Sequence, residues 1–179
     1  MNPYETIRSL KGVGPKKEGL FHKIGIANYS DLLYYYPKRY EKRTFLENME
    51  QGIVGEKYVF YAKVAKGPVS KKTRTGLTVT RYELMQKGIR VDAVFFNNPY
   101  IKRQIRINET FCFFGKLERN FNRFSVVNPF VKKSAEQLDA GRLLPVYPLK
   151  QGIAQKDLQN AVKQVLKGES FIQEMLSET

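Results

Sequence analysis

Two aromatic residues four positions apart, Phe96 and Tyr100, stand just before a run of cations. The three cations of that run are Lys102, Arg103 and Arg106. An exposed ring can stack on a nucleobase, which contributes about 1–3 kcal/mol per base, while neighbouring cations attract phosphates. Aromatic residues beside a short helix also commonly close the end of a small barrel. Composition alone slightly favours that second role.

The charge of the chain points to a polyanionic partner. Lys and Arg number 31 against 17 Asp and Glu, so the formal net charge is +14. Eleven basic residues face only two acidic ones between Lys63 and Arg106, whereas the region after residue 133 is close to neutral. Such asymmetry favours nucleic acid, with an acidic membrane surface well behind it. A basic surface kept only for solubility is the alternative.

Further basic residues are candidates for contacts with a nucleic-acid backbone. Lys71, Lys72 and Arg74 fall in a predicted loop between two strands, where they could contact phosphates or simply be solvated. Arg90 shares the outward side of a predicted strand with Phe96. The predicted backbone contacts are therefore Lys71, Lys72, Arg74, Arg90, Lys102, Arg103 and Arg106.

A second phosphate site is predicted near the N-terminus. Gly12, Val13 and Gly14 permit a tight turn, and a helix that begins at Pro15 would add its positive dipole end. Lys16 and Lys17 would supply neighbouring charges, as in helix-hairpin-helix modules. The alternative is an interhelix turn whose Val13 is packed into the core.

The elements that position these residues suggest an OB-fold. Five runs have strand composition, at 58–66, 77–85, 89–96, 111–117 and 124–127. A short helix is predicted within 98–107, capped by Asn98, with Pro99 at its first position and Ile101 and Ile105 on its apolar side. Three strands, a helix and two strands is the order of an OB-fold barrel. Alternation in the third strand places Phe96 on the side facing away from the core.

For the whole chain we expect an α+β fold that consists mainly of β-strands. A small helix-hairpin-helix-like bundle over 1–48 precedes a five-stranded antiparallel OB barrel over 53–131. An extension with a C-terminal helix follows over 132–179. In the first region, Ser30 is the predicted N-cap of a helix that ends before Pro37. The last residues, 174–179, read as an unfinished helix, which favours a fragment of a longer protein.

The scarcity of cysteine and histidine and the lack of catalytic motifs in the sequence argue against several classes of protein. A single cysteine, Cys112, and a single histidine, His22, make a disulfide framework impossible and a zinc site improbable. We expect Cys112 to be buried and His22 to be exposed or half-buried. There is no phosphate-binding P-loop motif and no catalytic constellation. No apolar run approaches a membrane span and no secretory signal is visible, so a cytoplasmic protein is expected.

Three parts of the chain together resemble the N-terminal region of the RecG family of bacterial ATP-dependent helicases. The first part combines LKGVGPKK at 10–17 with LLYYYPKRYEKRT at 32–44. The others are VFFNNPYIKRQI at 94–105 and LLPVYPLKQGIAQKDL at 143–158. The resemblance implies an OB-fold wedge domain that binds the branch point of stalled replication forks and Holliday junctions. It also implies that Phe96 and Tyr100 match the family's pair of base-stacking aromatics.

The same resemblance sets expectations for cofactors and partners. ATP and Mg²⁺ would belong to motor domains outside this chain, which itself is expected to be non-catalytic and without a metal or cofactor. Branched DNA is the expected partner, with single-stranded-DNA-binding protein a further one through the full-length parent. A monomer in the bacterial cytoplasm, associated with the nucleoid, is expected. The rival functions are an RNA-binding OB-fold protein and a module whose basic surface docks an acidic protein.

Overall fold

The computed structural model describes residues 2–120, 122–150 and 152–167. These residues form two units. One unit contains Lys42–Leu143, and the other combines the residues up to Glu41 with those from Leu144 onward. The predicted boundaries at 48, 53 and 132 differ from this division, because the N-terminal helices and the C-terminal helix share one apolar core.

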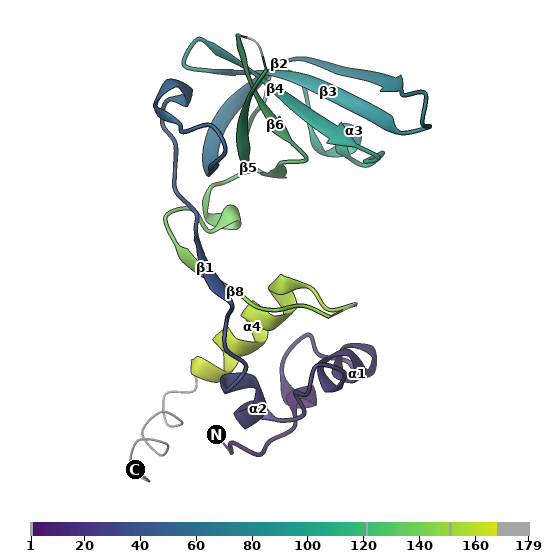
Figure 1. Cartoon of the computed structure of the whole chain (residues 1–179), viewed down its shortest axis with the longest axis vertical. Coiled ribbons are helices and arrows are strands. Elements are labelled where there is room, and N and C mark those ends of the chain that lie inside the picture. Colours follow the sequence, from purple (N-terminus) through teal and green to yellow (C-terminus); the bar gives the residue numbers. More distant parts are fainter. Residues whose placement is uncertain (1, 121, 151, 168–179) are drawn as a thin grey trace. The chain divides into compact units, whose positions relative to one another are not determined.

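The unit of 42–143 is built on a six-stranded sheet (Figure 1). Its strands follow the order β2-β3-β4-β6-β5-β7, and an additional pairing of β2 with β5 curls the sheet back on itself. The elements are β2 (Lys57–Lys72), β3 (Thr78–Gln86), β4 (Ile89–Phe96), α3 (Ile101–Gln104), β5 (Thr110–Asn120), β6 (Arg123–Val127) and β7 (Phe130–Lys132). The predicted OB-fold order is confirmed. Two details differ: β4 and β6 pair in parallel, and β7 was not predicted.

Strict alternation decides which side of each strand is buried. Val91, Ala93 and Phe95 of β4 are buried, together with Tyr82 and Leu84 of β3. These side chains enter the main apolar core of the sheet, so the intervening residues face outward. The predicted orientation of β4 is therefore confirmed.

Strand β2 is longer than its composition predicted. It continues to Lys72 with two register irregularities, one of them between Lys66 and Val69. Gly67 lies at this irregularity with φ +119°, and a Cβ atom there would meet the Arg81 carbonyl oxygen at 2.9 Å. The expected loop is thus reduced to a turn of a few residues that ends before Thr78. Lys71 and Lys72 consequently lie on a strand rather than in a loop.

Helix α3 is shorter than predicted. It spans only Ile101–Gln104, and its N-cap residue is Tyr100 rather than Asn98. Ile101 and Ile105 are buried against the sheet, as their spacing predicted. The core fixes the helix through these two isoleucines, and the residues before it form the connection from β4.

The other unit contains most of the helices. These are η1 (Ile7–Ser9), α1 (Pro15–His22), α2 (Tyr29–Leu33) and α4 (Gln155–Leu166). Helix α1 begins at Pro15, as predicted. The N-cap of α2 is Asn28 rather than Ser30, because the side chains of Asn28 and Asp31 cap each other's backbone N–H groups. Leu158, Ala161 and Val165 of α4 are buried with the apolar residues of α1 and α2.

Four short elements and two single residues complete the description. Strands β1 (Arg39–Lys42) and β8 (Leu143–Val146) pair with each other, and 3-10 helices η2 (Met49–Gln51) and η3 (Glu136–Leu138) lie in the 42–143 unit. Cys112 is buried and His22 is exposed, as expected. No helix in the described ranges is long and apolar enough to cross a membrane. The predicted final helix at 174–179 lies outside the described residues.

Candidate nucleic-acid interface

The rings of Phe96 and Tyr100 are both available to solvent. Phe96 ends β4 and is 40% exposed, and Tyr100, the N-cap of α3, is 72% exposed. Their chain neighbours Phe95 and Ile101 are the residues that fill the core at this point. The structure therefore gives the barrel-closing role to Phe95 and Ile101 and leaves the predicted pair free for stacking.

Hydrogen bonds to two asparagines fix the backbone around Phe96. The Phe96 N–H donates to Asn128 Oδ1 at 2.8 Å, and the Asn128 N–H donates to the Val94 carbonyl at 2.7 Å. On the other side, the Thr78 N–H donates to Asn97 Oδ1 at 3.0 Å. Asn97 and Asn128 have φ of +49° and +44°, a region that asparagine tolerates better than most residues. The end of β4 is thereby anchored to β3 and to the segment after β6.

Strand register brings a cation into line with Phe96. Val79 of β3 pairs with Lys71 of β2 on one side and with Phe96 on the other. Directly paired residues project to the same side of a sheet, so Lys71 and Phe96 share the outer face. Lys72 follows, paired with Thr78, and Arg74 lies in the turn beyond it. Lys71, Lys72 and Arg74 are all exposed.

The cations after Tyr100 differ in their surroundings. Lys102 and Arg103 are exposed on α3. Arg106 follows the helix and lies 4.0 Å from a carboxylate oxygen of Glu109, which also binds Lys133. The hydrogen bond from Lys133, aided by the charges of Lys133 and Arg106, lowers the pKa of the Glu109 carboxyl. Lys102 and Arg103 therefore offer more net charge to a ligand than Arg106 does.

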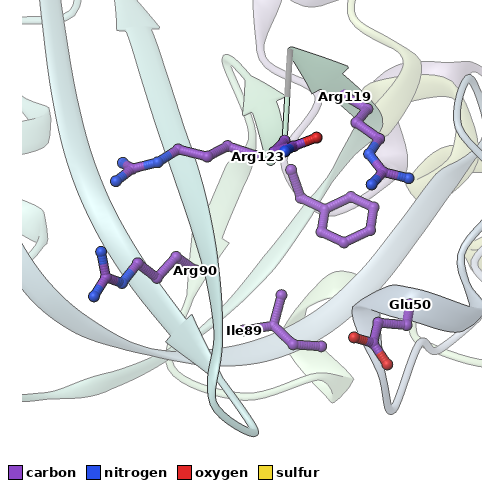
Figure 2. Close-up of a pocket in the computed structure, with 7 residues that line it drawn as sticks. Glu50, Ile89, Arg90, Arg119 and Arg123 are labelled. Atoms are coloured by element: carbon purple, nitrogen blue, oxygen red, sulfur yellow. The ribbon is translucent and has the colours of Figure 1, made fainter.

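Arg90 is not brought to the aromatic pair. It lies six residues before Phe96 on the same strand, which corresponds to about 20 Å. Arg90 instead lines a separate hollow with Arg119 and Arg123 (Figure 2). This hollow could not be predicted from the sequence, because its arginines come together only through the pairing of β4 and β5 with β6.

The predicted N-terminal phosphate hairpin is held against α4. The Lys11 N–H donates to Gln164 Oε1 at 2.9 Å, and Lys17 forms an ion pair with Asp157 at 2.8 Å. Val13 is half-buried against the helical core, and Gly12 has φ +88°. Lys16 and Gly14 are exposed. These contacts resemble the structural alternative, and the phosphate-binding role stays a prediction.

An OB-fold sheet whose outer face carries exposed aromatic rings and cations is typical of nucleic-acid-binding domains. The sequence model of the RecG wedge domain matches residues 6–168 of the chain. The chain therefore belongs to the RecG wedge domain family, as the motifs predicted.

Relatives agree with this assignment, and a solved structure shares the fold. ATP-dependent DNA helicase RecG of Staphylococcus aureus strain MRSA252 is 32% identical over 171 residues, which cover 92% of this chain and 24% of the relative. RecG of Staphylococcus epidermidis strain ATCC 12228 is 32% identical over 168 residues with the same coverage. A structure of RecG bound to a three-way DNA junction shares the fold, with a TM-score of 0.73 and 24% identity over 94% of this chain and 23% of that one. The chain thus spans about a quarter of the length of these relatives.

Proposed function

We propose that this chain is the DNA-binding wedge of an ATP-dependent helicase that remodels branched DNA such as stalled forks and Holliday junctions. The observation that carries the proposal is that Phe96 and Tyr100 are both exposed, and that Phe96 shares an outer face of the OB-fold sheet with Lys71. Family membership supports it, because the relatives are named ATP-dependent DNA helicases and one solved relative is bound to a three-way junction.

In this mechanism the wedge binds and divides strands without catalysing a reaction. Cations of the hairpin formed by β2 and β3, together with those of α3, attract the phosphates of the arms. The rings of Phe96 and Tyr100 cover the base pair at the branch and replace the stacking that is lost when the strands part. Because Asn97 and Asn128 anchor the end of β4, the rings act as a fixed obstacle. Motor domains outside this chain would supply the work by hydrolysing ATP with Mg²⁺.

The proposal also includes expectations about oligomeric state, location, partners and cofactors. The chain acts as a monomer in the bacterial cytoplasm, close to the nucleoid. Single-stranded-DNA-binding protein contacts the full-length parent. Neither a metal nor a cofactor is needed by the wedge itself.

Competition binding tests the proposed function against its two rivals. The chain is mixed with a labelled three-way DNA junction and with equal masses of unlabelled duplex DNA, structured RNA or junction. We expect only the unlabelled junction to compete efficiently and binding to weaken steeply with salt, because phosphate contacts release counterions. More efficient competition by RNA would favour the RNA-binding function. No retention of any nucleic acid at moderate salt would favour docking of an acidic protein.

A further inference from the structure

A pocket of about 430 Å³ lies where β2 passes between β3 and β5. Lys63 of β2 pairs with Met85 of β3 on one side and with Thr110 of β5 on the other, and all three residues line the pocket. Directly paired residues project to the same side of a sheet, so these three side chains form one row. Ala62 and Val64 are buried in the main core, so the row between them faces outward.

The last residue of β3, Gln86, gives this pocket a buried polar group, and we call it the Gln86 pocket. Gln86 lines the pocket and is only 5% exposed. Its Nε2 donates to the Leu46 carbonyl at 3.1 Å, which fixes the orientation of the amide. Among the described residues, no group donates a hydrogen bond to Gln86 Oε1. A buried acceptor without a partner costs free energy, so this atom is expected to receive a hydrogen bond from outside the chain.

Aromatic and apolar side chains also line the Gln86 pocket. Phe45 and Tyr61 contact each other edge to face, with ring centres 5.9 Å apart, and each ring is more than a third exposed. The Tyr61 hydroxyl accepts a hydrogen bond from the Ala135 N–H at 2.9 Å, which holds that ring in place. Met85 is half-buried beside them. Aromatic surface combined with a hydrogen-bond acceptor suits a planar ligand that carries N–H groups.

The charges of the Gln86 pocket favour an anionic ligand. Of the described residues that line it, two are lysines, Lys63 and Lys87, and one is acidic, Glu47. Lys87 lies 3.8 Å from a carboxylate oxygen of Glu47, so these two charges offset each other. Lys63 is exposed and supplies the excess positive charge. An ammonium group in this place can bind a phosphate.

We propose that the Gln86 pocket binds a free nucleoside phosphate whose base carries an exocyclic amino group. The amino group donates to Gln86 Oε1, the base lies against the rings of Phe45 and Tyr61, and Lys63 binds a phosphate. The volume of about 430 Å³ lies within the range of small-ligand pockets. In a duplex the amino group is engaged by the complementary base, whereas a free nucleotide leaves it available. Junction binding does not require this ligand, so the proposed function and the nucleotide site can fail separately.

Titration of the chain with ATP, followed by NMR, tests the proposal. ATP is a suitable probe because the sequence contains no P-loop motif that would bind it. The side-chain amide signals of Gln86 report on the acceptor. ATP is compared with purine riboside triphosphate, which lacks the amino group, and with inorganic triphosphate, which lacks the base.

Three variants complete the test. Q86M removes the acceptor and K63Q removes the phosphate contact. The control K116Q removes an exposed lysine of β5 that does not line the pocket. Thermal melting verifies that each variant is folded. Should Q86M fail to fold, K63Q and the comparison of ligands on the unchanged chain decide the result.

We expect ATP to shift the Gln86 amide signals and to bind about twofold to tenfold more tightly than purine riboside triphosphate, as the loss of one hydrogen bond predicts. Q86M should abolish that difference, K63Q should weaken ATP binding several-fold, and K116Q should change neither. Unshifted Gln86 signals, or equal affinities for ATP and inorganic triphosphate, would overturn the proposal. A short single-stranded oligonucleotide that shifted the same signals at lower concentration than ATP would assign the pocket to nucleic acid and would also overturn it.

Discussion

Lys71 and Phe96 lie in one row of the sheet, each paired with Val79 between them. The row joins the long β2–β3 hairpin to the end of β4, although the two residues are 25 positions apart in the chain. An ammonium group and an aromatic ring thereby share one outer face. This arrangement allows one ligand to contact a phosphate site and a stacking site together.

Replacing Lys71 with glutamine is expected to weaken junction binding several-fold through the loss of one phosphate contact. The slope of log K against log salt should become smaller by about one. Binding titrations over a range of salt concentrations measure both quantities. The control K132Q removes an exposed lysine of β7. Equal salt slopes for K71Q and K132Q would show that Lys71 does not contact the phosphates.

Replacing Gly67 with alanine is expected to destabilise the protein by about 1–3 kcal/mol. The residue has φ +119°, and the added Cβ would lie 2.9 Å from the Arg81 carbonyl oxygen. Gly14 is the matched control, since it has φ −91° and open space around its Cβ position. Denaturant unfolding compares the two variants. A loss of stability in Gly14→Ala as large as in Gly67→Ala would contradict this explanation.

Asn128 is expected to act as a positioning residue for Phe96. Asn128→Gly keeps the positive φ accessible but removes the side-chain oxygen that accepts the Phe96 N–H. We expect weaker junction binding and faster hydrogen exchange at the Phe96 amide, measured by NMR. Unchanged exchange at that amide together with weaker binding would mean that Asn128 acts in another way.

Burial of Cys112 makes stability depend on pH in the alkaline range. Burial raises the pKa of its thiol to about 11 from an ordinary value of 9.0. Between these values the unfolded thiol loses its proton while the folded one keeps it, so the free energy of unfolding falls as the pH rises from 9 to 11. At about pH 10 the loss is about 1 kcal/mol. Urea unfolding of the protein and of Cys112→Ala measures the difference, and identical pH profiles would contradict it.

The core strands could be predicted from the sequence because burial of one face imposes strict alternation. Val91, Ala93 and Phe95 alternate with Arg90, Asp92, Val94 and Phe96, of which all but Val94 are exposed or half-buried, and this alternation places Phe96 outside the core. The outer part of β2 has no such pattern, because its residues do not enter the core. Cross-strand contacts such as that of Ser70 with Thr80 hold it instead, so its glycine, proline and lysines were assigned to a loop.

The site could be predicted only where its residues are close in sequence. The cations of α3 follow Phe96 and Tyr100 directly in the chain. The resemblance to the RecG family identifies the two aromatic residues as a stacking pair. The row through Val79 depends on strand register, and the hollow depends on the parallel pairing of β4 with β6. Single-sequence patterns do not specify either relationship. Alternation correctly predicts that Arg90 and Phe96 share a face, but the strand separates the two residues by about 20 Å.

The proposed function depends above all on recognition of the branch point by the rings of Phe96 and Tyr100. The most direct test is the ratio of affinities for a fork and a plain duplex, measured for the unchanged chain and for F96A/Y100A. Phe130→Ala is the control, since Phe130 is an aromatic residue of the same sheet that is 64% exposed. Loss of stacking on even one base predicts that F96A/Y100A lowers the ratio at least about fivefold, whereas Phe130→Ala leaves it unchanged. A fork preference that survives in F96A/Y100A would contradict the account.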